Sequence, residues 1–275
     1  MKIGFYIKDK SYENSPVLKE MFAGLKAAGC ELYNVDSRDD LRSDTDMVMS
    51  IGGDGTFLSA SKRVAASGIP IIGVNLGRLG FLSENSPENV VNAILNGEYT
   101  IERRTMLHAS VKGENIELPE GFWPYALNEV TVHRNGPAVL GIKVSIDKNT
   151  LPTYWADGLL VATSSGSTAY SLSVGGPICL PEAKVLVIAP ISPHNLNVRP
   201  LVVPNTSVVD ISIETRDDTA EMTTDNRSLT ISPEASITVS MAQFSLKRIR
   251  LAKSSFVKAL TSKLFWGEDI RNNGE

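Results

Sequence analysis

A glycine-rich turn between a short apolar run and a helical pattern constrains the fold more than any other stretch of the chain. The turn, Gly52-Gly53-Asp54-Gly55-Thr56, follows the apolar residues 47–51 and precedes a helical pattern over 57–66. Glycines let the backbone take left-handed dihedrals and approach a ligand closely. The helix that follows directs unpaired N–H groups and the positive end of its dipole at the same point, which suits a phosphate. The pattern predicts a strand, a turn and a helix.

The carboxylate of Asp54 leaves two interpretations of this turn open. In a turn that attracts anions, a carboxylate needs a role such as accepting a proton or holding a cation, and the hydroxyl of Thr56 is close in sequence. The alternative is a tight turn in which Asp54 caps the next helix. The spacing matches neither the dinucleotide fingerprint nor the P-loop. Because a turn carboxylate is not part of a core, we expect folding to tolerate its substitution.

Composition excludes several classes of protein. The 275 residues allow one large domain or two of ordinary size, and we expect two. A net charge of -4 provides no broad basic field for nucleic acid or an anionic membrane. Two cysteines are too few for a disulfide framework or a structural zinc site. The chain begins with a strand pattern rather than a secretory leader, and no apolar stretch reaches the ~18 to 20 residues that span a bilayer. We expect a soluble, cytoplasmic protein.

Strand and helix patterns alternate over residues 1–98. Ser15-Pro16 and Ser86-Pro87 each combine an N-cap residue with a proline at the first helical position. The strand patterns between the helices are apolar throughout, at residues 3–7, 31–35, 47–51 and 71–74. This alternation predicts a parallel, Rossmann-like sheet covered on both faces. Ligands of such sheets bind at the carboxyl ends of strands, where the glycine turn lies.

From about residue 99 the pattern changes to strands separated by turn residues, and helix signals almost vanish. This part, residues 99–252, is predicted to be a β-rich, antiparallel, sandwich-like domain. A last amphipathic helix lies within 253–275 and is expected to return to the first domain. Its apolar side chains at helical spacing are Phe256, Val257, Leu260, Leu264 and Phe265.

Several further residues could carry chemistry, and each has a structural alternative. In the loop after the fourth strand, Arg78 could meet phosphate or be an exposed loop residue, and Phe81 could stack on a base or join the core. Asn128 and Glu129 could bind ribose hydroxyls or begin a surface strand. Asp157, which precedes a glycine, is equally explained as a turn residue.

A hydroxyl-rich segment, residues 163–173, is harder to explain structurally. So many hydroxyls with small residues at a predicted helix start indicate a polar concave surface, which a buried core element would not tolerate. The histidines, His108, His133 and His194, are weak signals individually. Nothing in the sequence resembles a Ser-His-Asp set or a metal-ligand cluster.

Taken together and in this order, these stretches resemble the NAD kinase family. The glycine turn is shared with diacylglycerol and sphingosine kinases and, loosely, with phosphofructokinases, but the hydroxyl-rich segment is not. The matching stretches, which cover nearly the whole chain, are 52–56, 79–81, 128–129, 157–158, 166–170, 192–194 with 199–200, and 263–267. The resemblance implies an α/β first domain, a β-rich second domain and a last helix that returns to the first. It also implies transfer of a phosphoryl group from ATP to the adenosine-ribose 2'-hydroxyl of NAD, a divalent cation, most commonly Mg²⁺, and a homo-oligomer, usually a dimer or tetramer.

The resemblance also assigns roles to individual residues. Asp54 resembles the catalytic acid of the turn, with Gly53, Gly55 and Thr56 beside it at the phosphates. Phe81 resembles the aromatic residue that contacts adenine. On the NAD side, the matching residues are the ribose-binding pair Asn128 and Glu129, the nicotinamide-side carboxylate Asp157, and the segment residues Thr168, Ala169, Tyr170 and Ser173.

The chain departs from the family pattern at three places. Thr163-Ser164-Ser165-Gly166 stands where many relatives have Thr-Pro-Thr-Gly, and Trp155 where an Arg is frequent. Both affect the finer contacts with NAD, whereas Asp225-Asn226-Arg227 in place of Asp-Gly-Gln affects a turn. Two other functions stay open, a lipid or sphingoid-base kinase and a nucleotide-sensing module without turnover. The pattern also leaves open whether polyphosphate or NADH is accepted.

Overall fold

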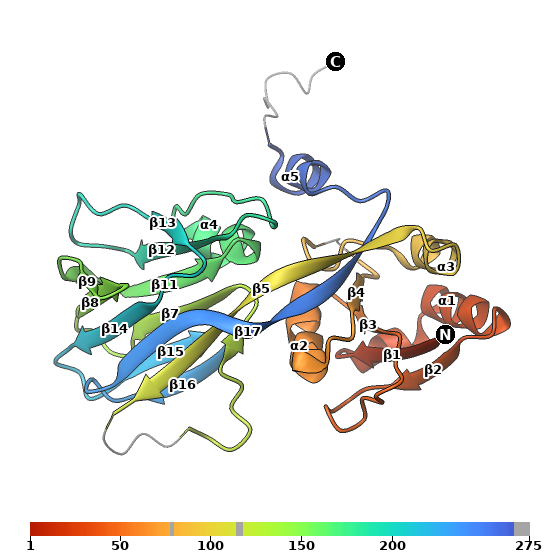
Figure 1. Cartoon of the computed structure of the whole chain (residues 1–275), viewed down its shortest axis with the longest axis horizontal. Helices are drawn as coiled ribbons and strands as arrows, with labels where there is room; N and C mark the ends of the chain where they lie inside the picture. The colour runs from red at the N-terminus through yellow and green to blue at the C-terminus, as the bar shows by residue number, and fades with distance from the viewer. Residues whose placement is uncertain (78–79, 114–117, 267–275) are drawn as a thin grey trace. The chain divides into compact units, whose positions relative to one another are not determined.

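A computed structural model describes residues 1–77, 80–113 and 118–266 of the chain. The chain divides into two compact units, Met1–Arg103 with Leu246–Glu275, and Arg104–Ser245. Two long strands, β5 (Tyr99–Lys112) and β17 (Ser236–Leu251), contribute residues to both units (Figure 1). The chain therefore passes from one unit to the other within strands rather than in loops, and the domain limits expected at residues 98 and 252 remain predictions.

The first unit contains a parallel sheet with the strand order β4-β3-β1-β2, and β17 pairs in parallel with β4. Every residue of β3 and β4 is buried, which explains why these strands are apolar throughout. The strands are β1 (Lys2–Ile7), β2 (Glu31–Asn34), β3 (Met47–Ile51) and β4 (Ile71–Val74). The helices are η1 (Lys10–Asn14), α1 (Pro16–Ala27), α2 (Asp54–Val64), η2 (Ala65–Ser67), α3 (Pro87–Leu95) and α5 (Phe256–Leu264). The prediction of an α/β first domain is confirmed.

The starts of α1 and α3 lie where the sequence places them, at Pro16 and Pro87. Ser15 and Ser86 occupy the N-cap positions, but neither side chain makes a capping hydrogen bond to the described helices. Proline at the first helical position is the effective signal here, because its fixed φ suits a helix and its missing N–H needs no partner.

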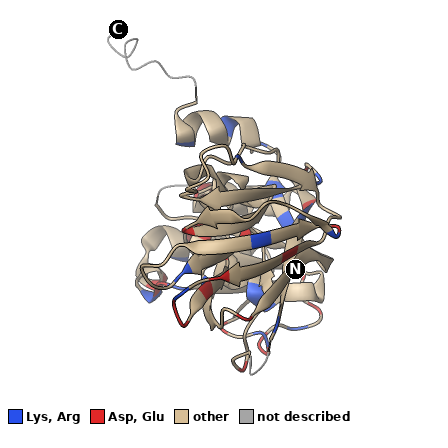
Figure 2. Ribbon diagram, turned by 90° about the vertical axis from the view of Figure 1, so that its left-hand side faces the viewer, with Lys and Arg blue, Asp and Glu red and all other residues tan. Residues whose placement is uncertain are grey.

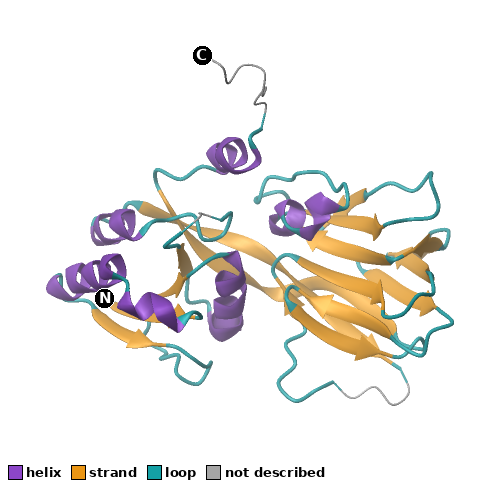
Figure 3. Ribbon diagram, turned by 180° about the vertical axis from the view of Figure 1, so that it is seen from behind, coloured by secondary structure: helices purple, strands orange, loops and turns teal. Residues whose placement is uncertain are grey.

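The second unit pairs antiparallel strands into two sheets that share one core (Figure 3). Val130, Val161 and Met222 of one sheet lie in the same apolar cluster as Val144 and Ile237 of the other, as in a sandwich. One sheet has the order β13 (Leu201–Pro204), β12 (Val185–Ile191), β11 (Gly158–Thr163), β7 (Glu129–Arg134), β15 (Ala220–Thr224), β16 (Arg227–Ile231). The other includes β5, β6 (Tyr125–Ala126), β8 (Leu140–Ile146), β9 (Asn149–Thr150), β10 (Tyr154–Ala156), β14 (Val209–Glu214) and β17. The predicted β-rich second domain is confirmed.

The C-terminal helix α5 belongs to the first unit, as predicted. Its Phe256 ring lies 6.0 Å from the ring of Phe81, and Ala259 is buried. The prediction that α5 has a continuous apolar face is only partly correct, because Val257 and Phe265 are 60% and 58% exposed. Among the described helices, none combines the length and the hydropathy that crossing a membrane requires. Acidic and basic residues are interspersed along the ribbon (Figure 2).

A buried arginine on β17, Arg248, ties the loop after β4 to the sheet of the first unit. Its guanidinium donates to the carbonyl oxygens of Phe81 and Leu82, both at 3.3 Å. It also pairs with the carboxylates of Glu84 at 2.6 Å and Glu102 at 3.4 Å. Arg248 is 2% exposed, so its guanidinium requires such partners, because an uncompensated buried charge is costly. The sequence pattern placed Arg248 in a strand but gave it no role.

Replacing Arg248 with Met should lower the free energy of unfolding of the protein by about 3 to 5 kcal/mol, because the largely buried carboxylate of Glu84 and two carbonyls lose their partner, while Glu102 keeps its ion pair with Arg250. Urea denaturation followed by circular dichroism measures this change. Lys143→Met, which removes one half of an exposed ion pair with Glu214, is the control and should change stability by less than about 1 kcal/mol. An equally small effect of both variants would mean that Arg248 is not a structural anchor.

Candidate functional site

The glycine turn follows β3 as predicted, but helix α2 begins inside it, at Asp54. Gly52 has φ 140°, and a Cβ there would lie 2.5 Å from Oγ1 of Thr56, so the position requires glycine. Gly53 is the N-cap residue, and its carbonyl accepts the N–H of Thr56 at 2.9 Å. Around Gly55, a Cβ would meet no described atom within 4 Å. The residues predicted to bind phosphate, Gly53, Gly55 and Thr56, therefore lie at the N-cap and in the first turn of α2.

The carboxylate of Asp54 holds the loop that follows β4. Its Oδ1 accepts the N–H groups of Leu82 at 3.0 Å and Ser83 at 2.8 Å, and its Oδ2 accepts the N–H of Phe81 at 2.9 Å. Gly80 makes this approach possible, since a Cβ there would lie 1.9 Å from Oδ1. The interpretation of Asp54 as a helix cap is wrong. The expectation that folding tolerates its substitution also loses its basis, because the loop depends on this carboxylate.

The same hydrogen bonds define what Asp54 can still bind. A carboxylate offers about four acceptor positions. The loop N–H groups occupy three of them, two on Oδ1 and one on Oδ2. Within the described residues, one position on Oδ2 is left for a proton or a cation.

A lysine of helix α5, Lys263, lies on the other side of this loop. Its Nζ donates to the carbonyl of Gly80 and lies 4.9 Å from the centroid of the Phe81 ring. Burial lowers the pKa of Lys263, while the carboxylates of Glu84 and Asp54 oppose that shift. Phe81, predicted to stack on a base or join the core, packs against Lys263 and Phe256 in this structure. The other candidate of this loop, Arg78, lies outside the described residues.

In the second unit, Asn128 and Glu129 lie where the central strand β7 begins. They are 8% and 7% exposed, so the alternative of a surface strand is wrong. The carbonyl of Asn128 accepts the N–H of Thr163 at 2.8 Å. At Gly166 a Cβ would lie 2.2 Å from that carbonyl oxygen, so only glycine lets the hydroxyl-rich segment pass so close to β7.

The side chain of Glu129 is buried with an unsatisfied oxygen. Its Oε2 has no hydrogen-bond partner among the described residues, and a backbone hydrogen bond from Tyr170 reaches the carboxylate. Burial, together with the negative charge of Asp225, raises the pKa of Glu129 to about 8. At neutral pH the group is therefore mainly protonated, and it can donate a hydrogen bond as well as accept one.

Tyr170 and Asp157 come together around a histidine of β7. The ring of Tyr170 stacks on His133, with centroids 5.7 Å apart and planes inclined by 15°. Strand alternation places His133 on the same face of β7 as Glu129. Asp157 pairs with Arg134 at 2.8 Å. Burial lowers the pKa of His133 and raises that of Tyr170, and the negative charge of Asp157 acts to raise both. His133 was a weak signal in the sequence, and Arg134 gave none.

The hydroxyl-rich segment is more buried than predicted. Ser164, Ser165, Ser167 and Ser171 are all buried, so the expectation that a core element would not tolerate such hydroxyls is wrong. Two of these hydroxyls are satisfied by carbonyls, since Ser164 donates to Pro181 at 3.0 Å and Ser167 to Ser164 at 2.7 Å. The hydroxyls of Ser165 and Ser171 have no hydrogen-bond partner among the described residues. The segment forms two short helices, η3 (Ser165–Thr168) and α4 (Tyr170–Ser173). The residues assigned to the NAD site are all accessible, since Thr168 and Ala169 are partly exposed and Tyr170 and Ser173 are exposed.

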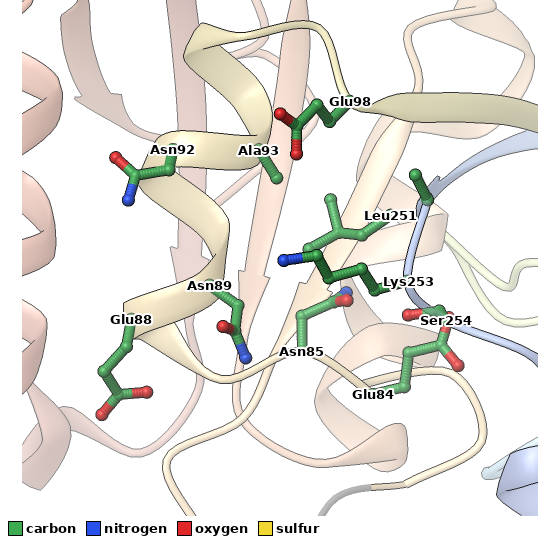
Figure 4. A pocket seen from close by; sticks show the side chains of 11 residues that line it. Glu84, Asn85, Glu88, Asn89, Asn92, Ala93, Glu98, Leu251, Lys253 and Ser254 are labelled. Atoms are coloured by element: carbon green, nitrogen blue, oxygen red, sulfur yellow. The ribbon is translucent and has the colours of Figure 1, made fainter.

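Two pockets formed by described residues lie outside these groups of candidate residues. A pocket of about 260 Å³ in the first unit is lined by α3, the segments on either side of it and the segment after β17, with the side chains of Glu84, Glu88, Glu98 and Lys253 among the lining residues (Figure 4). A groove in the second unit lies beside Trp155, which is 45% exposed. Among residues 1–77, 80–113 and 118–266, no group of three or more His, Cys, Asp and Glu side chains is arranged to hold a metal ion.

Comparison with known families gives two matches, which together cover most of the chain. Residues 5–99 match the ATP-NAD kinase N-terminal domain, and residues 127–251 match the ATP-NAD kinase C-terminal domain. Both candidate groups of residues, around Asp54 and around Asn128 and Glu129, lie within these matches.

Individual relatives match most of the chain. An NAD kinase of Flavobacterium psychrophilum is 39% identical over 93% of this chain and 89% of its own length, and one of Flavobacterium johnsoniae is 35% identical over 99% and 100%. Among solved structures, an Archaeoglobus fulgidus NAD kinase in complex with ATP has a TM-score of 0.76 and 26% identity, covering 92% of this chain and 95% of its own. Yeast NADH kinase complexed with NADH has a TM-score of 0.84 at 23% identity, covering 99% and 90%, which supports the fold alone. The chain belongs to the NAD kinase family.

Proposed function

We propose that this protein transfers the γ-phosphoryl group of ATP to the 2'-hydroxyl of the adenosine ribose of NAD and so forms NADP. The observation that carries this proposal is membership of the NAD kinase family over nearly the whole chain, with Asp54 retained at the first turn of α2. A lipid kinase that shares only the glycine turn would not account for the match of residues 127–251 to the ATP-NAD kinase C-terminal domain.

The glycine turn is the proposed phosphate site. The first turn of α2 leaves backbone N–H groups without partners inside the helix, and its dipole favours an anion. Gly53 and Gly55 let phosphate oxygens approach this backbone, and the hydroxyl of Thr56 adds a donor. Phe81, on the loop that Asp54 holds, is proposed to contact adenine.

The described residues fit a Mg²⁺ ion that arrives with ATP rather than one held permanently by the protein. Mg²⁺ commonly binds through one or two carboxylates, substrate phosphates and water. The described chain offers no cluster of metal-ligating side chains, so the phosphates of ATP and water would supply most of the ligands of the ion. When bound, the ion would neutralise charge on the phosphates.

Asp54 is proposed to act on the attacking hydroxyl. The ribose 2'-oxygen forms a bond to the γ-phosphorus, the bond from that phosphorus to the bridging oxygen breaks, and ADP leaves with the electron pair. The hydroxyl proton passes to the free acceptor position of Asp54. Because phosphoryl transfer depends mainly on positioning and charge neutralisation, the fixed carboxylate is as important as its basicity.

The second unit is proposed to bind NAD. Asn128 and Glu129 would hold ribose hydroxyls, since an amide and a protonated carboxyl can both donate and accept. Asp157 would lie toward the nicotinamide side, and the accessible residues Thr168, Ala169, Tyr170 and Ser173 would line the site. We further propose a cytoplasmic homo-oligomer, a dimer or tetramer, that binds neither nucleic acid nor membrane. The family resemblance supports the oligomer, the low cysteine count supports a reducing cytoplasm, and the net charge of -4 supports the absence of nucleic-acid and membrane binding.

A coupled assay tests the proposed reaction directly. The protein is incubated with Mg-ATP and NAD, and NADP is followed with an NADP-specific dehydrogenase. We expect NADP to form at a rate proportional to enzyme concentration. If no NADP forms while a lipid in a test panel becomes phosphorylated, the lipid-kinase alternative is correct. If neither reaction occurs but NAD binds, the protein is a nucleotide sensor.

Asp54→Asn should lower kcat by about 10²-fold or more, because an amide cannot accept the hydroxyl proton. The amide nitrogen would also face the loop N–H groups, so stability should fall by about 1 to 3 kcal/mol. Kinetics and thermal unfolding, measured on the same preparation, separate the two effects. Asp40→Asn is the control, since Asp40 also accepts a backbone N–H, that of Ser37, in an exposed turn. Near-normal turnover of Asp54→Asn would exclude the base role, and recovery at high Mg²⁺ would favour a metal ligand.

The pH dependence of stability tests the environment of Glu129. Its folded-state pKa of about 8 lies above the ordinary value of 4.5, so between these values the folded protein retains a proton that the unfolded chain releases. Stability contributed by the protonated group is therefore present below pH 4.5 and is lost as the pH rises toward 8. Glu129→Gln cannot titrate, so its stability relative to the parent protein should increase by up to ~1.4 kcal/mol per pH unit in this window.

Urea denaturation of both proteins at pH 5, 6, 7 and 8 provides this comparison. Glu221→Gln is the control, because Glu221 is only partly buried and lies opposite His133 on β15. A constant difference between Glu129→Gln and the parent protein across these pH values would show that Glu129 is ionised throughout.

A further inference from the structure

A buried carboxylate in a hairpin turn, that of Asp225, binds the backbone at the start of β7. Its Oδ1 accepts the N–H groups of Asn128 at 2.8 Å and Glu129 at 3.4 Å, and its Oδ2 accepts that of Leu127 at 3.0 Å. In return, the N–H of Asp225 donates to the carbonyl of Glu129 at 2.9 Å. The turn between β15 and β16 is thus joined to the residues proposed to bind ribose.

The turn itself does not require a carboxylate at this position. Asp225 has φ 53°, and asparagine adopts this left-handed conformation at least as readily. A carboxylate that is 1% exposed is costly to bury, and burial raises the pKa of Asp225. The N–H donors and the guanidinium of Arg227, 3.4 Å away, oppose that shift and favour the ionised form. The carboxylate is therefore explained by what it binds rather than by the turn.

The location of Asp225 also affects the side chain of Glu129. Burial and the negative charge of Asp225 both raise the pKa of Glu129. The backbone N–H of Tyr170 contacts Glu129 from the hydroxyl-rich segment and acts in the opposite direction. Asp225 thus fixes the backbone of the pair and favours the form of Glu129 that can donate a hydrogen bond.

We propose that Asp225 is a positioning residue for NAD recognition, which holds Asn128 and Glu129 in the orientation that binds the ribose. This inference rests on the proposed function, because it assigns the ribose to that pair. Asp225 itself need not touch NAD. The departure of residues 225–227 from the family pattern, which the sequence indicated to affect only a turn, retains this aspartate.

The test separates NAD from ATP in steady-state kinetics. Asp225→Asn should raise KM for NAD by about 10-fold or more, as expected when charge-assisted hydrogen bonds to a buried backbone are lost. The KM for ATP should change by less than about 2-fold, because the glycine turn lies on the other unit. A merely structural defect would instead reduce the amount of active enzyme and leave both KM values unchanged.

A second background tests whether Asp225 acts through the pair. In a variant that already carries Asn128→Ala and Glu129→Gln, adding Asp225→Asn should change KM for NAD by less than about 2-fold, since coupled residues are not additive. A full effect in this background would overturn the proposal. Asp147→Asn is the matched control, because Asp147 also has a positive φ in a hairpin turn and accepts a backbone N–H, that of Val208, at 2.9 Å. It should leave both KM values unchanged.

Hydrogen exchange of the unsubstituted protein covers the case in which Asp225→Asn does not fold. The amides of residues 127–129 should exchange as slowly as those within β7, although their acceptor is the side-chain carboxylate of Asp225 and not a backbone carbonyl. Rapid exchange of these amides would overturn the proposal. If the unsubstituted protein forms no NADP, the proposed function fails, while the exchange measurement still decides whether Asp225 holds this backbone.

Discussion

The candidate site depends on one constraint, which is that every buried backbone N–H group needs a hydrogen-bond acceptor. Loops near a ligand cannot use sheet hydrogen bonds, yet their amides still require acceptors. In this protein a carboxylate from a distant turn accepts them in each unit: Asp54 binds residues 81–83, and Asp225 binds residues 127–129. Both proposed substrate-binding loops are therefore fixed before any ligand arrives, which lowers the entropy cost of binding.

Local patterns were sufficient to predict most of the fold. Continuous apolar strands such as β3 indicate a sheet covered on both faces, and alternation such as that of β14 indicates a sheet with one buried face. Gly52 announces a turn because no other residue adopts its φ easily. These signals depend on neighbours in the chain, and for that reason they are visible in the sequence.

The parts that sequence reasoning missed depend on residues far apart in the chain. Arg248 binds Glu84 across 164 positions, and Asp225 binds Asn128 across 97, so no spacing rule links them. The buried serines misled the prediction for a different, local reason, because a hydroxyl such as that of Ser167 can be satisfied by the carbonyl of a residue three positions earlier. The interpretation of Asp54 as a cap failed because its donors belong to another loop.

The contact between Gly80 and Asp54 restricts the order in which the two positions can change during evolution. A side chain at position 80 would overlap the carboxylate, so any larger residue there must follow the loss of Asp54. Loss of Asp54 alone leaves the loop amides without their acceptor, so the first step of such a path is already unfavourable. The two residues, 26 positions apart, are therefore expected to persist or disappear as a pair in related sequences.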